Sequence, residues 1–345
     1  MKAAQFTGIR RLRIADVPEP QIQEPFEVRV RIDRVGVCGS DVHYYVNGRI
    51  GEQRLQYPAS VGHECAGTVV ETGSGVDRLK PGDRVAIDPA IVCGQCDQCR
   101  AGRVNTCRKI RFMGCPGQAP GALAEYCVLP AENCLALPDA MTMDHAALLE
   151  PLSIGLHAVK LGDVFPASRI AVIGAGPIGL SVLLCAKATA PVTAYVTDLI
   201  DRRLEVARRC GADWTGNPRQ QNVVAEILEC EPLGLDLVFE CSGDPATIDQ
   251  ATQLLTPGGT LVLVGIPPEA RATFDIHQMR VNELVFKNVR RQKGCLAPVI
   301  RLVSEGQINL APLLTHRFPL ARTAEAFDLV AGYDDGVIKA VIEVT

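Results

Sequence analysis

Four cysteines lie close together in one short segment of the chain. Cys93, Cys96 and Cys99 are separated from one another by two residues, and Cys107 follows eight positions later. Thiolates with this spacing can converge on one tetrahedral zinc ion at about 2.3 Å from each sulfur. Four protein ligands leave no position open for a substrate, so the cluster predicts a structural zinc site. A disulfide knot or four unrelated buried thiols are the alternatives, and a reducing compartment would disfavour the knot.

A second set of metal-binding side chains comes from three separate segments. Cys38 supplies a thiol, His63 an imidazole, and Glu64 and Glu150 supply carboxylates. A catalytic zinc ion takes three protein ligands and keeps one position open for water or a substrate oxygen. Each residue alone has a structural explanation, as a core thiol, a buried histidine or a helix cap. Together they predict a second, catalytic zinc site, for which Cys38 and His63 supply two ligands.

A glycine-rich segment stands where an apolar run leads into a helical one, and its residues are Gly174, Ala175, Gly176, Pro177, Ile178 and Gly179. The first glycine permits a tight turn, the second the approach of a pyrophosphate, and the third close packing of the helix. Asp198 follows nineteen residues after the last glycine, where a carboxylate hydrogen-bonds ribose hydroxyls and repels a 2′-phosphate. We therefore predict NAD rather than NADP, with Arg203 in the same site. The alternatives are a glycine turn that binds no nucleotide and Asp198 as a helix cap.

The apolar pattern divides the chain into two kinds of structure. Up to about residue 150 it consists of short strands and turns, such as 26–32 and 80–85, and reads as all-β. Farther on, helix-like stretches alternate with apolar runs at 170–174, 192–198, 235–240 and 260–264. This alternation is typical of a doubly wound parallel sheet. We expect one domain from 1–153 and 290–345, to which 315–320 and 337–344 return, and a second from 154–289.

Composition narrows the possible partners. The 345 residues, 47% of them hydrophobic, suffice for two cores. Lys and Arg number 35 against 39 Asp and Glu, so no basic field favours nucleic acid or an anionic membrane, and a small-molecule partner is expected. The first residues lead into a charged segment with Arg10, Arg11 and Arg13, and they contain no apolar core of a signal peptide. The uncharged stretch 170–186 is interrupted by glycines, which disfavours a transmembrane helix. These features predict a cytoplasmic protein whose 14 cysteines are reduced.

The segment 62–67, Gly-His-Glu-Cys-Ala-Gly, continues to Gly73 and Val76 and resembles the zinc signature of the zinc-containing medium-chain dehydrogenase/reductase family. The likeness runs over essentially the whole chain. The chain resembles the polyol dehydrogenase branch of this family at 38–45, 48–51, 150–155 and 315–320. The resemblance implies an α/β protein with a GroES-like β domain that holds the metal, a Rossmann domain that binds NAD, and an active cleft between them. It also implies a homo-oligomer, a tetramer.

The resemblance also assigns roles to residues. It implies that Glu64, Glu150 or a water held by Glu150 completes the catalytic zinc shell, because Glu150 stands where alcohol dehydrogenases carry a second cysteine. Ser40 and His43 stand at proton-relay positions. The substrate-pocket positions are occupied by Tyr44, Phe112, Glu150 and Arg291. Gln292 follows the arginine where the animal sorbitol enzymes have tyrosine.

The expected reaction is a reversible, NAD-linked oxidation of a secondary alcohol in a polyol such as sorbitol, xylitol or galactitol to a ketose. One zinc ion acts as a Lewis acid that favours loss of the hydroxyl proton, and the second is structural. A threonine or simple alcohol dehydrogenase is the enzyme alternative. A nucleotide-binding protein without catalysis is the alternative of another class, since fold alone does not determine function.

Overall fold

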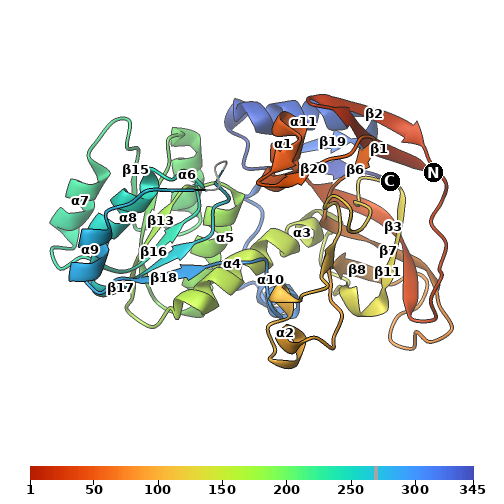
Figure 1. Cartoon of the computed structure of the whole chain (residues 1–345), viewed down its shortest axis with the longest axis horizontal. Helices are drawn as coiled ribbons and strands as arrows, with labels where there is room; N and C mark the ends of the chain where they lie inside the picture. Colours follow the sequence, from red (N-terminus) through yellow and green to blue (C-terminus); the bar gives the residue numbers. More distant parts are fainter. Residues whose placement is uncertain (268–270) are drawn as a thin grey trace. The chain divides into compact units, whose positions relative to one another are not determined.

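The computed structural model describes residues 1–267 and 271–345. Their contacts divide the chain into two compact units, each with its own sheet (Figure 1). The first unit comprises Met1–Glu150, Leu296–Ser304 and Leu314–Thr345. The second comprises Pro151–Cys295 and Glu305–Leu313.

A seven-stranded sheet in the order β12-β8-β7-β3-β20-β19, with β11 also paired to β3, forms the centre of the first unit. Its strands are β3 (Glu27–Gly36), β7 (Glu64–Thr72), β8 (Arg84–Ile87), β11 (Tyr126–Pro130), β12 (Cys134–Ala136), β19 (Leu314–Pro319) and β20 (Lys339–Glu343). The period-two pattern of β3 places Val28, Val30 and Ile32 in the core, where all three are fully buried. The closing strand β20 pairs antiparallel with β3, with Val341 opposite Gly36.

Smaller elements complete the first unit. The strands are β1 (Lys2–Gly8), β2 (Arg11–Asp16), β4 (Arg49–Ile50), β5 (Gln53–Arg54), β6 (Ala59–Ser60), β9 (Ala90–Ile91) and β10 (Arg111–Phe112). The helices are α1 (Gly39–Asn47), α2 (Asp97–Arg100), α3 (Met143–Ala147), α10 (Leu296–Ser304) and α11 (Thr323–Gly332). The expectation that the chain is all-β up to about residue 150 is therefore wrong for α1, α2 and α3, of which α1 matters most for the site.

Helix α1 depends on tertiary packing. Valine and two tyrosines make it a poor helix former by intrinsic propensity. The ring of Tyr45 packs at 5.4 Å from Phe6 and 5.3 Å from Phe327, measured between ring centroids. Gly48 ends the helix in the left-handed conformation, with φ 68°, and donates its N–H to the carbonyl of Tyr44. Burial of these aromatic rings stabilises a helix that the local sequence does not predict.

The second unit is a six-stranded sheet in the order β15-β14-β13-β16-β17-β18, and all its neighbouring strands are parallel. The strands are β13 (Arg169–Ile173), β14 (Thr193–Thr197), β15 (Trp214–Gly216), β16 (Leu235–Glu240), β17 (Leu255–Leu263) and β18 (Val285–Asn288). This confirms the predicted doubly wound fold class. Four strands match predicted apolar runs; the edge strands β15 and β18 were missed because they are short.

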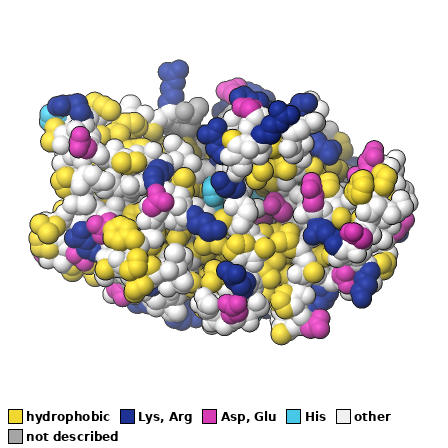
Figure 2. Space-filling view, turned by 90° about the horizontal axis from the view of Figure 1, so that it is seen from below, with side chains coloured by type: hydrophobic (Ala, Val, Ile, Leu, Met, Phe, Trp, Pro, Cys, Tyr) yellow, Lys and Arg dark blue, Asp and Glu magenta, His cyan; other side chains and the backbone are white. Residues whose placement is uncertain are grey.

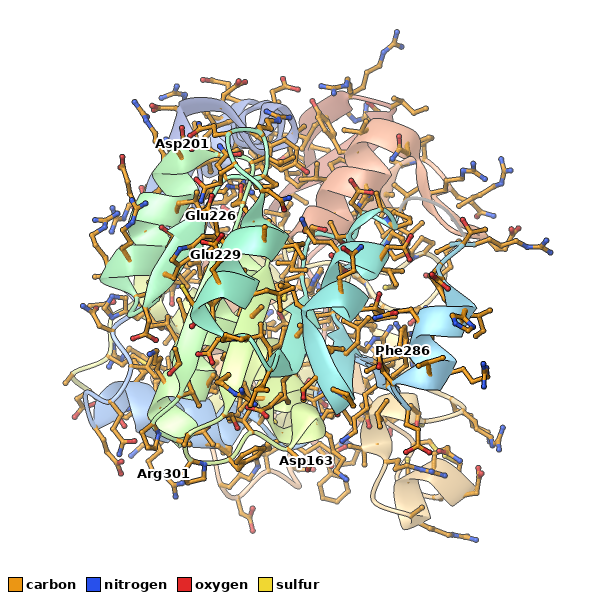
Figure 3. All side chains as sticks on the ribbon, turned by 90° about the vertical axis from the view of Figure 1, so that its left-hand side faces the viewer. Asp163, Asp201, Glu226, Glu229, Phe286 and Arg301 are labelled. Carbon is orange, nitrogen blue, oxygen red and sulfur yellow. The ribbon has the colours of Figure 1, made fainter. Side chains whose placement is uncertain are left out.

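Within the described residues, one helix precedes these strands and five others connect them. These helices are α4 (Leu149–Gly162), α5 (Pro177–Thr189), α6 (Asp201–Arg209), α7 (Val223–Cys230), α8 (Thr247–Leu254) and α9 (Ile276–Val281). Figure 3 looks onto this unit and shows Asp201 at the start of α6 and Glu226 and Glu229 on α7. The central strand β13 is apolar and buried, as expected of a strand covered on both faces.

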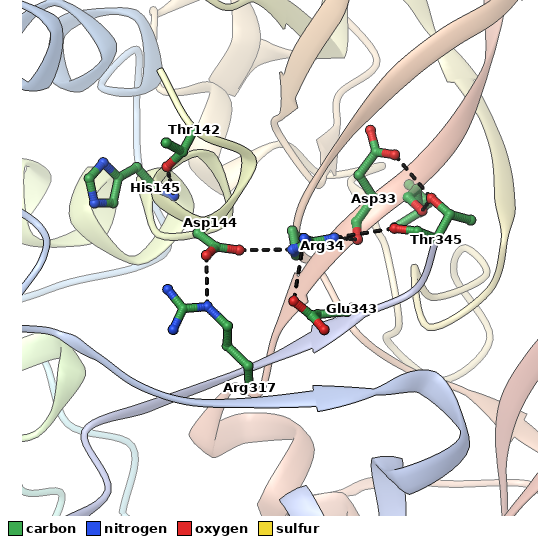
Figure 4. A network of polar contacts seen from close by, with 9 residues as sticks. Asp33, Arg34, Thr142, Asp144, His145, Arg317, Glu343 and Thr345 are labelled. Atoms are coloured by element: carbon green, nitrogen blue, oxygen red, sulfur yellow. Dashed lines mark hydrogen bonds and ion pairs between the residues drawn. The ribbon is translucent and has the colours of Figure 1, made fainter. Parts of the chain in front are cut away.

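An ionic network holds the end of the chain to the rest of the first unit (Figure 4). Asp144 accepts hydrogen bonds of 2.8 Å from the Nε atoms of both Arg34 and Arg317, one on each carboxylate oxygen. Arg34 also pairs with Glu343 at 3.4 Å and donates to the backbone oxygen of Thr345. Burial would raise the pKa of Asp144, but the two arginines outweigh burial and hold this pKa below its ordinary value. The network thus joins α3 to strands β3, β19 and β20.

Basic and acidic side chains are interspersed on the face drawn in Figure 2. This distribution agrees with the near balance of 35 basic and 39 acidic residues. Within the described residues, none of the helices combines the length and the apolar character needed to cross a bilayer.

Candidate metal and cofactor sites

The four-cysteine cluster has the dimensions of a tetrahedral metal site. Its sulfur atoms are separated by 3.6 Å for Cys96 and Cys99, 3.9 Å for Cys96 and Cys107, and 3.5 Å for Cys107 and Cys93. Sulfurs at 2.3 Å from one zinc ion would stand about 3.8 Å apart along each tetrahedron edge. Disulfide sulfurs would instead be about 2 Å apart, and all four thiols are free. The donor set and its spacing therefore fit zinc.

Short elements present the sulfurs of this cluster. Cys96 precedes the single-turn helix α2, and Cys107 follows a 3₁₀ turn at Val104–Thr106. Backbone N–H groups of Cys99 and Arg108 lower the pKa of Cys96 to about 6, whereas desolvation raises the pKa of Cys99 to about 12. The backbone N–H groups thus favour the thiolate form, which binds metal, at Cys96.

Helix α1 carries the side chains around Cys38. Cys38 is the residue before the first turn of α1, and Ser40 and His43 lie on the helix. The hydroxyl of Ser40 donates to the sulfur of Cys38 at 3.2 Å. Burial lowers the pKa of His43, which keeps its ring neutral near pH 7.

His63 is held between Asp41 and Cys38. Its Nδ1 atom lies 3.5 Å from Oδ2 of Asp41, whose side chain is buried, and its ring also interacts with the sulfur of Cys38. Burial opposes protonation, but the charges of Asp41 and Cys38 outweigh it and raise the pKa of His63. A carboxylate behind a histidine is the usual support for a metal-binding imidazole. Sequence reasoning missed Asp41, although its place three residues after Cys38 was a signal.

Glu64 is paired with a buried lysine. Lys339 of β20 places its Nζ atom 2.7 and 2.6 Å from the two carboxylate oxygens of Glu64 and 3.0 Å from the carbonyl oxygen of Val37. Both side chains are at most 2% exposed. Sequence reasoning missed Lys339 as well. The available signal was a single basic residue directly before the apolar residues 340–342.

Glu150 lies in the first turn of α4 and is 6% exposed. Burial and then the charge of Glu64 raise its pKa to about 8, against the opposing effect of His63. Across the described residues, only the Cys93 cluster brings three or more ligand atoms within 4.8 Å of one another. Cys38, His63 and Glu150 are therefore more widely spaced than the four thiols, although as donors they form the thiol, imidazole and carboxylate set that a catalytic zinc ion takes.

The predicted substrate residues divide between the units. In the first unit Phe112 packs its ring edge against His63, with centroids 5.1 Å apart, and the buried Tyr44 donates from its hydroxyl to Gln53. In the second unit Arg291 has a left-handed backbone conformation, with φ 52°. Gln292 is buried and accepts the N–H of Cys295 at 2.8 Å through its side-chain oxygen.

The glycine-rich turn follows β13 and leads into α5. Gly174 has φ 95°, and a Cβ atom placed on it would lie 2.9 Å from the backbone nitrogen of Ser242. A Cβ on Gly179 would collide with the carbonyl oxygen of Gly174. Gly176 is the N-cap of α5, and Pro177 and Ile178 are its first residues. Glycine is therefore required at 174 and 179, and the helix terminus offers free N–H groups to an anion.

Asp198 lies at the carboxyl end of β14, beside the glycine-rich turn. Its carboxylate accepts the N–H of Ala175 at 2.7 Å and that of Ile200 at 2.9 Å. The guanidinium of Arg203, on α6, reaches the same turn: its Nη1 atom lies 3.6 Å from the position of a Cβ on Gly176. A carboxylate and a guanidinium thus flank the place where a dinucleotide phosphate would approach.

Comparison with known proteins identifies the class of this arrangement. Residues 24–139 match the alcohol dehydrogenase GroES-like domain, and residues 177–305 match the zinc-binding dehydrogenase domain. The sorbitol dehydrogenase of Bacillus subtilis (strain 168) is 35% identical over 99% of this chain and 97% of its own. That of Gallus gallus is 41% identical over 93% and 90%. The crystal structure of galactitol-1-phosphate dehydrogenase from Escherichia coli has a TM-score of 0.91 and 29% identity, covering 100% of both chains.

The chain therefore belongs to the zinc-containing medium-chain dehydrogenase/reductase family, in its polyol dehydrogenase branch. It is an oxidoreductase that acts on alcohols, and the expected family is confirmed.

Proposed function

We propose that the protein catalyses the reversible, NAD-linked oxidation of a secondary hydroxyl group of a polyol to a ketose. The observation that carries this proposal is the thiol, imidazole and carboxylate set of Cys38, His63 and Glu150, with Asp41 buried behind the imidazole. This donor set suits a zinc ion with one open position. A protein that only binds nucleotide would have no need of it.

Two zinc ions per chain follow from the two donor sets. Cys93, Cys96, Cys99 and Cys107 hold the structural ion, while Cys38, His63 and Glu150 hold the catalytic one. Glu64 is the weaker candidate for the catalytic shell because both of its oxygens are already bonded to Lys339. When bound, the catalytic ion supplies Lewis acidity, which lowers the pKa of a coordinated hydroxyl group.

The side chains around Cys38 are suited to moving the hydroxyl proton. Ser40 can pass a proton because a hydroxyl both donates and accepts hydrogen bonds. His43 can receive it because its buried ring is neutral near pH 7. A carboxylate offers two oxygens, so Glu150 can bind the metal with one and hold a water molecule with the other. A bound NAD would supply the hydride acceptor, to which the hydride passes from the carbon that carries this hydroxyl group.

Asp198 supports NAD as the cofactor. A carboxylate about 4 Å from a 2′-phosphate costs roughly 4 kcal/mol at an effective dielectric of 20, an upper figure that solvent reduces. We expect a preference of about a hundredfold in kcat/KM for NAD over NADP, close to 2.7 kcal/mol. In Asp198→Ala and in Asp198→Asn the preference for NAD over NADP should fall to about tenfold or less, as measured by steady-state kinetics with each cofactor.

Asp201→Ala is the matched control for this cofactor test. Asp201 begins the neighbouring helix, and its carboxylate is bonded to Asn217 and Gln220. It should leave the NAD preference unchanged. Equal efficiency of the parent enzyme with NADP would refute the cofactor assignment.

A substrate panel tests the reaction itself. We expect polyols of about four to six carbons to give the highest kcat/KM among polyols, ethanol, benzyl alcohol and threonine, scored by NADH absorbance. Glu150 makes the metal site richer in oxygen than a site with two cysteines, which suits a vicinal diol. A tail without hydroxyls leaves buried polar groups unpaired, at about 1–3 kcal/mol each. If ethanol, benzyl alcohol or threonine were the best substrate, the polyol assignment would fall while the zinc assignment would stand.

A homo-oligomer, by resemblance a tetramer, is part of the same proposal. The edge strand β18 pairs only with β17 within the described sheet, and Val285 on it is 42% exposed. Ile276 and Val281 of the adjacent helix α9 are also exposed. Exposed apolar side chains together with an open sheet edge offer a suitable surface for a second copy. A cytoplasmic location agrees with the 14 free cysteines.

A further inference from the structure

Glu240 is a buried carboxylate to which the reaction described above assigns no role. It ends β16 and is only 3% exposed. Its Oε1 atom accepts hydrogen bonds from the backbone nitrogens of Ser242, at 2.8 Å, and Gly243, at 2.9 Å. The hydroxyl of Ser242 also donates to it, and the hydroxyl oxygen of Thr247 lies 3.1 Å away. A single carboxylate oxygen thus bonds to several groups of the turn that follows β16.

This turn packs between two glycine turns from the neighbouring strands. On the β13 side, Cys241 donates its N–H to the carbonyl oxygen of Ile173 at 2.8 Å, and a Cβ on Gly174 would lie 2.9 Å from the nitrogen of Ser242. On the β17 side, a Cβ on Gly265 would lie 2.6 Å from the Cα atom of Gly243 and 2.7 Å from Oε2 of Glu240. The backbones approach so closely that displacement of residues 241–243 would also displace the turn at Gly174.

The sheet topology gives this location its significance. The strand order reverses between β13 and β16, because the chain builds outward from β13 to β15 and then returns to add β16 on the other side. In open parallel sheets, ligands bind at the carboxyl ends of the strands at this reversal. Glu240 is the last residue of one of the two strands concerned, and the glycine-rich turn follows the other.

We propose that Glu240 is a positioning residue for the dinucleotide, which fixes the turn 241–243 against Gly174 and thereby shapes the nucleotide crevice. This inference rests on the proposed NAD dependence. The hydrogen bonds described above connect the carboxylate to the turn that follows β16, so it acts on the dinucleotide through this turn. Its loss should therefore weaken cofactor binding while the rate at saturating cofactor stays nearly unchanged.

The geometry requires a side chain long enough to place an oxygen beside the two N–H groups, and the charge of that side chain alone is not sufficient. Glu240→Asp keeps the charge but withdraws the oxygens from the two N–H groups by one methylene. Glu240→Gln keeps an acceptor oxygen at the same reach and removes the charge. If positioning is the role, the glutamine variant should largely preserve the function and the aspartate variant should not.

The test measures the Kd of NAD and the kcat at saturating NAD for the full-length, zinc-loaded protein. We expect Glu240→Asp to raise the Kd at least tenfold with kcat within twofold of the parent, and Glu240→Gln to stay within threefold in both. The matched control is Asp236→Asn, on the same strand but toward its other end. Asp236 also accepts a backbone N–H, that of Arg169 at 2.8 Å, and its variant should lower the unfolding temperature without changing the Kd.

Three outcomes would overturn the inference. They are an unchanged Kd in Glu240→Asp, an equal loss of affinity in the glutamine and aspartate variants, and a fall in kcat without a change in Kd. If Glu240→Asp does not fold, the deciding variant is Thr247→Val, which removes one hydroxyl beside Oε1 and keeps the side-chain volume. A three- to fivefold rise in its Kd for NAD supports the inference, and an unchanged Kd refutes it. Failure of the parent enzyme to bind NAD would instead refute the proposed function.

Discussion

Replacement of Cys38 by serine is expected to lower kcat/KM at least about a thousandfold, because it removes a thiolate from the catalytic metal shell. Lewis acidity at the reacting oxygen is worth several kcal/mol, and about 4 kcal/mol corresponds to this factor. Cys38 lies at the start of α1 and is partly exposed, so the fold should be little affected. The unfolding temperature should stay within about 3 °C of the parent value, a change of roughly 1 kcal/mol. Steady-state kinetics, calorimetry and elemental analysis measure these three quantities.

Metal content separates this prediction from simple inactivation. The parent should carry about two zinc ions per chain, and Cys38→Ser about one. Cys230→Ser is the control, because Cys230 is an exposed thiol on α7 and outside both donor sets. It should keep both ions and full activity. Activity of Cys38→Ser above about a tenth of the parent value would show that Cys38 is not a ligand.

Replacement of Cys99 by serine should have the opposite pattern of effects. Structural zinc contributes roughly 10–16 kcal/mol to the folding of isolated finger peptides. The segment 93–107 contains only the short helix α2 and one 3₁₀ turn, and α2 has no buried residue, so the metal must supply most of its stability. We expect an unfolding temperature at least about 5 °C lower, proteolytic cleavage within 93–107, and loss of one zinc ion. Since the rest of the first unit has its own core, the loss should be partly local.

The activity of Cys99→Ser distinguishes the two zinc sites. Folded protein that keeps its catalytic zinc ion should retain a kcat within a few-fold of the parent. Cys115→Ser, a cysteine near the cluster in sequence but outside it, serves as the control and should keep two ions. A Cys99 variant as stable as the parent but inactive would contradict the division into a structural and a catalytic site.

The sequence by itself predicted the features that depend on short spacing. The four cysteines from Cys93 to Cys107 and the glycines from Gly174 to Gly179 each act within one turn or loop, so residue spacing determines which atoms converge. Alternating apolar and helical runs likewise predicted the parallel sheet, because strand burial follows directly from local hydrophobicity. The short edge strands β15 and β18 escaped because few of their residues carry such a signal.

Only the tertiary structure decided which distant groups meet. The pairing of Lys339 with Glu64 spans 275 positions and exists because β20 joins the sheet beside β3. Asp41 reaches His63 because the aromatic packing of Tyr45 holds α1 in place, against its weak helix propensity. The turn after Glu240 packs against Gly174 and Gly265 because three strand ends lie side by side at the reversal of strand order. A buried charge is placed by the chain segments that enclose it, and periodicity within one segment carries no information about the others.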